Sequence, residues 1–277
     1  MLRTDLLGVT SLARSLGGKS KIYGCLLGFF ASGAVKLDRV SRIWGGILSS
    51  HKMAYKVNGR VLLVVDGIKA PNSGCRMPAV KRLHQQSSSN TKPTYITGHS
   101  CQSIAILFGS LAGVFAVPVF TRILEGLRFS PKDKKSQIAK IPSLLKNALG
   151  EVPFYLVANA YYASGAFALS LMAMNGHLVT RAKGNAVAYH PVQKSGKPQR
   201  GRPRIYGKKV CLKALSKDSP AFVEAESPVY GDRGVKIRYR EVVLLWKPLG
   251  KAVKFVIVKH PTRGKRGGRV LSHDHGP

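Results

Sequence analysis

Acidic residues are scarce in this chain, and their scarcity sets its electrostatic character. Only 12 Asp or Glu residues stand against 45 Lys or Arg residues in 277, which gives a formal net charge of +33. A chain with this excess repels itself, so it is expected to act beside a polyanion. Nucleic acid is the first candidate for that polyanion, and an anionic membrane surface is the second.

The chain also lacks paired cysteines and an apolar leader. Cys25, Cys75, Cys101 and Cys211 lie far apart and form no Cys-x-x-Cys pair. Their spacing argues against a zinc ribbon or a redox motif and fits ordinary thiols in a reducing compartment. The N-terminal stretch MLRTDLLGVTSLARSLGG contains Asp5 and no long apolar segment, so we expect no secretory signal. A cytoplasmic location follows from these observations.

One charge-free run is long enough to cross a bilayer. Residues 100–121, SCQSIAILFGSLAGVFAVPVFT, carry no charged side chain. The run nevertheless contains Gln102 and Pro118, and the GSLAG in its middle is typical of a turn. Two buried strands joined by a hairpin are therefore the preferred interpretation, and no membrane contact is expected.

Apolar spacing and chain breakers predict the remaining segments of the first half. Apolar residues three to four positions apart favour helices in KIYGCLLGFFASG and KLDRVSRIWGGILSS. Residues 71–99 are polar and rich in breakers, so a loop is expected there. Residues 130–150 predict an amphipathic helix capped by Ser130, which Pro142 should kink or split.

Three runs rich in β-branched and aromatic residues predict buried strands. They are RVLLVVDG, VPFYLVANAYY and HLVTRAK, and a helix over about 164–175 separates the last two. A strand, helix and strand in this order form a βαβ unit with parallel strands. Further along, VKIRYREVVLLW and KAVKFVIVKH alternate as two strands separated by KPLG. The fold class is therefore α/β with some antiparallel strands.

Polar side chains follow the first two of these strands at their carboxyl ends. Asp66 ends the run LLVV, and Asn159 ends FYLVA. Parallel strands would bring both residues to one edge of the sheet, where α/β proteins place their sites. A pair of carboxylates at that edge would hold Mg²⁺, but Asn159 offers only a neutral oxygen. A turn-forming or helix-capping Asp66 is the alternative interpretation.

Four segments resemble, in order, the catalytic domain of bacterial insertion-sequence DDE transposases. They are VVDGIKAPNSGCRMPAVKRLHQQSSSNTKPTYITGHS, FYLVANAYYASG, GHLVTRAKGNAVAYHP and RGRPRIYGKKV, and the resemblance spans about residues 2–262. It implies a ribonuclease-H-like α/β fold with a mixed sheet and flanking helices. Three acidic residues of that family bind two divalent ions, Mg²⁺ or Mn²⁺, which activate a water or a DNA 3′-hydroxyl for attack on a phosphodiester.

The resemblance also implies how the chain divides. Apolar spacing predicts an N-terminal helical region over 1–55, and the resemblance predicts a ribonuclease-H-like catalytic core, incomplete in this chain, over 56–183. A basic, β-rich insertion is expected over 184–262. Residues 263–277 have no periodicity and are unlike the family, so a disordered tail is expected there.

The family's acidic residues carry over only in part. Asp66 matches the first acid and would be a catalytic residue and metal ligand, whereas Asn159 stands at the second. The third, a Glu on a helix beyond the insertion, has no counterpart before the sequence stops. Glu241 in RYREVVLL superficially matches a Tyr-Arg-Glu signature, but its segment alternates as a strand. A truncated, degenerate and catalytically inactive copy with too few ligands for two ions is therefore expected.

Basic residues gather between the second strand and residue 217. Val152 to Lys217 holds no Asp or Glu, and RGRPR within it has the core of an AT-hook, which lies in a narrow A·T minor groove. A solvated basic linker is the alternative for that pentamer. We expect this region to contact DNA phosphates. The candidate DNA-contact residues are Arg181, Lys183, Lys194, Lys197, Arg200, Arg202, Arg204, Lys208 and Lys209.

Two functions remain open from the sequence, besides the membrane alternative. The first is an insertion-sequence transposase that binds transposon ends, acts in the nucleoid of the cytoplasm as a homodimer, and has lost metal-dependent cleavage and strand transfer. The second is a nonenzymatic DNA-binding protein or regulator derived from the same scaffold.

Overall fold

The computed structural model describes residues 13, 20–72, 79–84, 93–110, 113–123, 137–183, 185–192, 201, 203–217, 221–229, 232–261 and 269–274. Four α-helices lie in these ranges: α2 (Ser20–Ala31), α3 (Leu37–Ser50), α4 (Gln137–Leu149) and α5 (Gly165–Met172). Two short 3₁₀ helices accompany them, η1 (Ala160–Tyr162) and η2 (Leu212–Ser216).

The strands of the described residues join into one sheet. Those of the first half are β1 (Lys56–Val57), β2 (Arg60–Pro71), β3 (Lys81–His84), β4 (Tyr95–Ser110), β5 (Gly113–Ile123), β6 (Phe154–Ala158) and β7 (Gly176–Arg181). Those of the second half are β8 (Val187–Tyr189), β9 (Lys209–Cys211), β10 (Val223–Glu226), β11 (Lys236–Trp246), β12 (Lys251–Lys259) and β13 (Arg269–Asp274).

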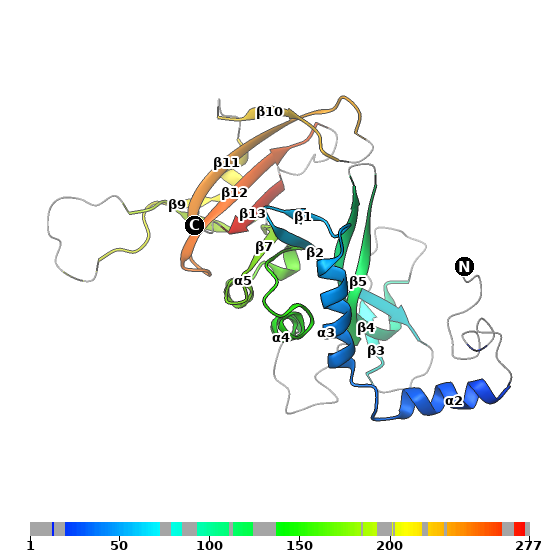
Figure 1. Ribbon diagram of the computed structural model, residues 1–277. Helices are drawn as coiled ribbons and strands as arrows, with labels where there is room; N and C mark the ends of the chain where they lie inside the picture. Colours follow the sequence, from blue (N-terminus) through cyan, green and yellow to red (C-terminus); the bar gives the residue numbers. More distant parts are fainter. Residues whose placement is uncertain are drawn as a thin grey trace.

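Strands β2, β6 and β7 form the parallel centre of the sheet. Strand β6 pairs with β2 on one side and with β7 on the other, both in parallel. Helix α5 connects β6 to β7, which confirms the expected βαβ unit. Strands β4 and β5 extend the sheet in antiparallel order beyond β2, and helices α3, α4 and α5 flank it (Figure 1). This mixed α/β arrangement agrees with the ribonuclease-H-like fold implied by the resemblance.

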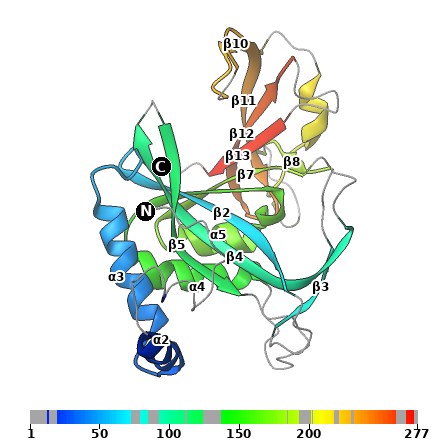
Figure 2. The ribbon, with the colours of Figure 1, turned by 90° about the vertical axis from the view of Figure 1, so that its right-hand side faces the viewer.

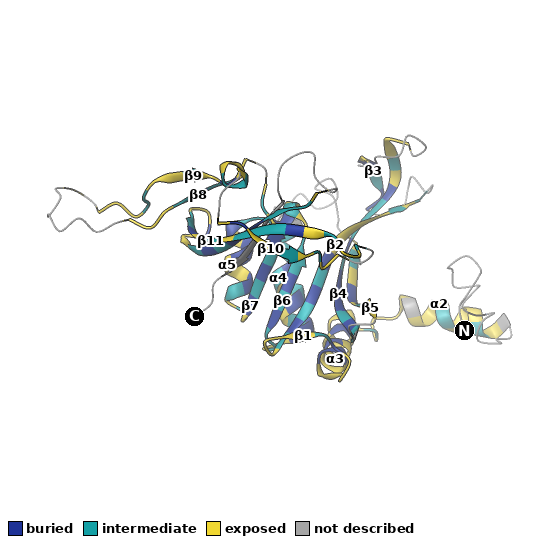
Figure 3. Cartoon of the chain, turned by 90° about the horizontal axis from the view of Figure 1, so that it is seen from above, coloured by how far each residue is buried: buried dark blue, intermediate teal, exposed yellow. Residues whose placement is uncertain are grey.

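Alternating residues of the central strands build the hydrophobic core. Leu63, Ile104 and Leu156 project from neighbouring strands and are fully buried. Helix α4 packs Ile141 and Leu145 into the same cluster. Figure 3 shows the alternation as dark blue and teal bands along β2, β6 and β7. A sheet with this period buries one face under helices and leaves the other partly exposed.

The apolar run over 100–121 is a β-hairpin, as expected. Strand β4 contains its first half and β5 its second, and Ser110 pairs with Gly113 across the turn. Within the ranges that the structure describes, no helix is both long and apolar enough to cross a membrane.

Pro142 does not split the helix that contains it. Helix α4 runs without interruption from Gln137 to Leu149 across Pro142. A proline inside a helix costs one hydrogen bond and a ring clash, about 3 kcal/mol. Burial of Ile141, Leu145 and Ala148 on the sheet offsets that cost. The expected cap Ser130 lies outside the described residues.

Two segments expected to be irregular contain strands. Residues 71–99 include β3 and the start of β4, which pair with each other. In the expected tail, Arg269–Asp274 forms β13 between β12 and β7. The edges of β12 and β7 would otherwise present unpaired backbone groups, and pairing with β13 satisfies them. The expectation of an unstructured tail is therefore wrong for these residues.

Close contact between α3 and α4 predicts opposite effects of alanine at two adjacent glycines. A Cβ at Gly45 would lie 2.1 Å from the Ala148 carbonyl oxygen, whereas a Cβ at Gly46 would meet nothing within 4 Å. We expect Gly45→Ala to lower the free energy of unfolding by about 1–3 kcal/mol through overpacking. Gly46→Ala should raise it by up to about 1 kcal/mol through helix propensity. Urea denaturation measures the free energy of unfolding of both variants. Equal effects would contradict the close contact between Gly45 and Ala148.

Candidate functional site

Strands β6 and β7 end beside the middle of β2, which continues past Asp66 to Pro71, so the expectation that Asp66 ends its strand is wrong. Val65, Ala158 and Thr180 are in register across β2, β6 and β7. Asp66 and Asn159 each follow one residue later, as does Arg181, the last residue of β7. All three side chains are exposed. The structure therefore brings together the two positions expected at this edge and adds a cationic neighbour from β7.

Asp66 and Asn159 are linked by a hydrogen bond whose direction matters. The Asn159 Nδ2 atom donates to Asp66 Oδ1 over 3.4 Å, a long and weak bond. The same carboxylate oxygen accepts the Gly67 N–H at 2.8 Å. The Asn159 Oδ1 atom accepts the Tyr161 N–H at 2.9 Å and so caps η1. The amide oxygen is therefore occupied, and the amide hydrogens face the carboxylate.

This donor set does not fit the two-ion centre that the resemblance implies. A divalent cation needs oxygen lone pairs, and here the hydrogens of the Asn159 amide occupy the space beside Asp66. Turning the amide oxygen toward Asp66 would break the cap to Tyr161, at about 0.5–2 kcal/mol. Within the described ranges, no group of three or more His, Cys, Asp or Glu side chains could hold a metal ion.

A buried polar pair lies under the Asp66 edge. The Gln102 Nε2 atom donates to the Tyr162 hydroxyl, and the two side chains are 5% and 2% exposed. Burial raises the pKa of the Tyr162 phenol, and the nearby charge of Asp66 raises this pKa further, against the lowering effect of the Gln102 bond. Thr180 Oγ1 donates to the Asn159 carbonyl oxygen at 2.8 Å. These buried contacts hold the residues around Asp66 and Asn159 in place from the core side.

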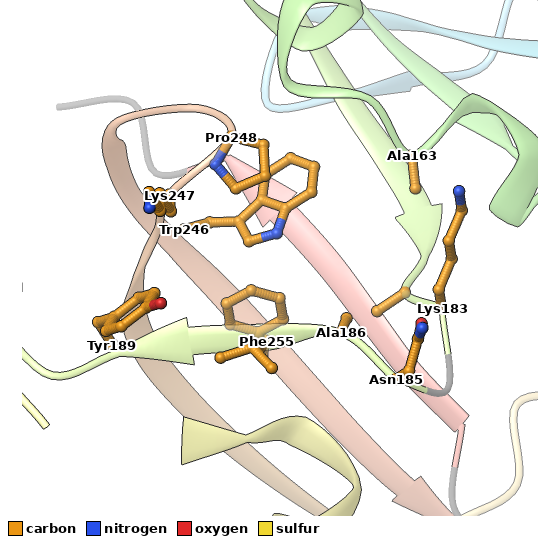
Figure 4. A pocket seen from close by; sticks show the side chains of 11 residues that line it. Ala163, Lys183, Asn185, Ala186, Tyr189, Trp246, Lys247, Pro248 and Phe255 are labelled. Atoms are coloured by element: carbon orange, nitrogen blue, oxygen red, sulfur yellow. The ribbon is translucent and has the colours of Figure 1, made fainter. Parts of the chain in front are cut away.

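A pocket of about 380 Å³ lies between the β7–β8 segment and the β11–β12 turn. Trp246, Tyr189 and Phe255 contribute aromatic rings to it, and Lys183 lines its other side (Figure 4). Ala163, which follows η1, is also part of the lining and connects the pocket to the segment after Asn159. Flat rings beside cationic groups suit a planar, anionic ligand such as a nucleotide.

The expected DNA-contact residues fall in several places. Arg181 ends β7 at the site, and Lys183 lines the pocket. Lys208 and Lys209 are exposed at β9, and Arg204 is exposed before it. The remaining expected residues lie outside the described part of the chain: Lys194, Lys197, Arg200 and Arg202. Two of the three arginines of the RGRPR segment are therefore not described.

Glu241 lies in a strand, as its alternating sequence predicts. It is part of β11, where it pairs with Val256 of β12. Its carboxylate forms an ion pair with Lys254 at 2.9 Å, and half of its side chain is exposed. This cross-strand ion pair accounts for Glu241 without a catalytic role.

The sequence did not indicate the pocket. Trp246 and Lys247 were assigned only to a strand end and its turn, and Asn185 to the start of the insertion. An aromatic residue followed by Lys in a tight turn was the available signal. It could not show that this turn packs against the β7–β8 segment, because the contact joins residues far apart in the chain.

Comparisons with known proteins found only distant structural similarity. No family model matches the chain, and no curated protein matches its sequence. The piggyBac transposase in a synaptic complex with hairpin DNA aligns with a TM-score of 0.39 and 12% identity, over 97% of this chain. The NurA nuclease from Sulfolobus solfataricus aligns with a TM-score of 0.31 and 10% identity, over 94% of this chain.

The two similar structures differ in how much of their own length is matched. The alignments cover 48% of the transposase chain and 82% of the nuclease chain. This chain thus spans about half the length of the transposase. At these TM-scores and identities, neither similarity assigns an activity.

The buried Gln102–Tyr162 pair predicts a stability effect that depends on pH. Tyr162→Phe leaves the Gln102 amide unpaired and should cost about 1–3 kcal/mol near neutral pH. The raised pKa of Tyr162 means that the folded state keeps its proton where the unfolded state loses it. Wild-type stability should therefore fall as pH rises above 10.0, the ordinary value for tyrosine.

Urea unfolding of three variants at neutral and alkaline pH checks this. Tyr162→Phe should reduce the alkaline loss, and adding Gln102→Leu to it should recover part of the neutral-pH cost, because both polar partners are then removed. An undiminished alkaline loss in Tyr162→Phe would assign the effect to other groups.

Proposed function

We propose that this chain is a transposase-like DNA-binding protein whose own strand-edge site does not cleave DNA. The proposal includes its finer form: a degenerate transposase of a bacterial insertion sequence that binds transposon ends as a homodimer in the nucleoid. The resemblance of the sequence segments supports this origin, and the fold is compatible with it.

One observation carries the proposed loss of cleavage. The Asn159 amide donates to Asp66, and its oxygen is held by the cap of η1. Catalysis by two ions depends on neutralising charge on both the attacking and the leaving oxygens. Asp66 is the one carboxylate in this pair. The pair therefore provides a single carboxylate ligand for a first ion and none for a second. We propose that neither Mg²⁺ nor Mn²⁺ is bound productively.

Charge and pocket chemistry support DNA binding. The net charge of +33 is sufficient to attract phosphates over a wide surface. Arg181 at the strand edge and Lys183 at the pocket place two of these charges beside each other along the chain. The aromatic rings of the pocket can stack on a base that has left the duplex. Phosphate contact and base stacking together favour DNA over an anionic membrane.

Separate measurements of DNA binding and DNA cleavage test the proposed function. Duplex DNA should bind with an affinity that falls at least about tenfold between about 50 and 200 mM salt. No product should form with Mg²⁺ or Mn²⁺, because the edge lacks paired carboxylates. Fluorescence anisotropy measures the binding, and gel electrophoresis of end-labelled DNA measures the cleavage. Metal-dependent cleavage by the wild-type chain would overturn the proposed inactivity.

Two substitutions at one position provide matched controls for the metal argument. Asn159→Asp places a second carboxylate beside Asp66, so Mg²⁺ should raise the thermal midpoint of this variant. Asn159→Ala removes the amide without adding charge, and Mg²⁺ should leave its midpoint unchanged, as in the wild type. A similar Mg²⁺ response in the wild type would show that Asn159 does not block the ion.

A nonenzymatic regulator is a second candidate function. The Asp66–Asn159 pair supports it as much as it supports the degenerate transposase. A regulator needs DNA binding but no carboxylate pair. It should compete with an active transposase for transposon ends and lower the yield of strand transfer. Absence of competition at saturating concentrations would contradict binding of transposon ends by either candidate.

The pocket predicts a preference for DNA that contains an unpaired base. Trp246→Ala should weaken binding to such DNA by about 1–3 kcal/mol, the usual contribution of one stacked base. Trp246→Phe keeps a ring and should lose less. Binding to fully paired duplex serves as the control and should change little for either variant. Equal losses on both DNAs would contradict the stacking role of Trp246.

A further inference from the structure

A three-stranded ribbon extends the sheet beyond Asp66. It consists of residues 67–71 of β2, all of β3, and residues 95–101 of β4, in the order β2–β4–β3. Figures 2 and 3 both show β3 and the adjoining end of β4 away from the helices that cover the main sheet. We call this segment the distal ribbon. Its strand β3 and the start of β4 fall within residues 71–99, where the sequence predicted only a loop.

The register places one row of distal-ribbon residues on the same face as Asp66. Asp66 pairs with Ser103, and every second residue of β4 from Ser103 back to Tyr95 shares that face. Tyr95 pairs with His84, and Arg82 pairs with Thr97 on the same face. Asp66, Arg82 and Tyr95 therefore lie on the same face of the sheet.

An exposed cationic and aromatic group lies at the far end of this row. The Arg82 guanidinium carbon lies 4.4 Å from the centroid of the Tyr95 ring. The His84 ring meets Tyr95 edge to face, with centroids 5.1 Å apart. Arg82 and His84 are exposed, and Tyr95 is 48% exposed. Stacking on the ring orients the guanidinium and leaves its N–H donors available to an anion such as phosphate.

The surrounding sequence contains no opposing charge. No Asp or Glu occurs between Asp66 and Glu125. Lys69 donates to the His84 carbonyl oxygen, which brings another cation close to the Arg82–Tyr95 group. Lys81 precedes Arg82 in β3. A cationic surface of this kind attracts a phosphate backbone, and no carboxylate within this segment competes for it.

The length of the row corresponds to a short stretch of DNA. Eight residues of β4 separate Ser103 from Tyr95, which at about 3.3 Å per residue is roughly 26 Å. One strand of B-DNA rises about 3.4 Å per nucleotide. A strand passing over the Asp66 edge would therefore reach Tyr95, on whose ring Arg82 stacks, about eight nucleotides away.

We propose that the distal ribbon is a second DNA contact, which binds the phosphate backbone of the DNA that flanks the Asp66 edge. Arg82 contacts phosphate, with His84 beside it on the same face. Tyr95 is a positioning residue that holds the Arg82 guanidinium in place. This inference rests on the proposed function, because it assumes that DNA is the polyanion the chain binds. It adds a surface formed by residues outside the basic segment between Val152 and Lys217.

Charge reversal at Arg82 tests the proposal against a matched control. Arg82→Glu in the full chain should weaken binding to fluorescent random-sequence duplex about tenfold or more and lower the magnitude of the salt slope by about 1. Lys236→Glu makes the same charge change at an exposed residue at the start of β11. This control should lose clearly less affinity. Equal losses for the two variants would overturn the proposal.

Substitutions at Tyr95 separate positioning from general charge. Tyr95→Ala keeps the net charge but releases the guanidinium, so it should weaken DNA binding about threefold or more. Tyr95→Phe keeps the ring and should bind as the wild type does. Far-ultraviolet circular dichroism and a thermal melt confirm that each variant is folded, and Arg82→Gln replaces Arg82→Glu if the latter unfolds. Wild-type affinity in Tyr95→Ala would overturn the role of Tyr95.

Failure of this inference is distinguishable from failure of the proposed function. If the wild-type chain does not bind duplex DNA at low salt, the proposed function fails and the distal-ribbon proposal fails with it. If the wild-type chain binds but Arg82→Glu and Lys236→Glu weaken binding equally, only the distal-ribbon proposal fails.

Discussion

The in-register parallel pairing of Val65, Ala158 and Thr180 holds the ends of β6 and β7 beside Asp66 of β2, and the candidate site depends on it. The pairing sets Asp66 beside Asn159 although 93 positions separate them in the chain. A shift of one residue would turn either side chain to the opposite face. Backbone hydrogen bonding and the burial of Leu63 and Leu156 on the helix side therefore fix the geometry of the polar edge.

Asn159 has two structural roles that a carboxylate could fill only in part. Its oxygen caps η1, and an aspartate could do the same. Its nitrogen donates to Asp66, and an aspartate would instead place like charges side by side unless a cation lay between them. The Asn159 amide therefore gives the Asp66 carboxylate a hydrogen-bond donor, where an aspartate would give it a like charge.

Expectations that rest on short stretches of sequence were confirmed, and those that depend on contacts between distant segments were wrong or missed. The hairpin of β4 and β5 and the βαβ unit of β6, α5 and β7 were predicted, because turn residues and β-branched or aromatic runs are local features of the sequence. Pro142 was misjudged because packing of Ile141 and Leu145 offsets the local penalty. Strand β3 was missed because its short polar sequence acquires strand geometry only by pairing with β4.

The sequence by itself determined the charge of the chain, the apolar strands, and the presence of an amide where a carboxylate would complete a pair. These features depend on residue type and short-range spacing. Only the tertiary structure decided that the Asn159 nitrogen, and not its oxygen, faces Asp66, that Trp246 and Lys183 line one pocket, and that Arg82 shares a face with Asp66. Each of these depends on register and packing between distant segments, which no local pattern encodes.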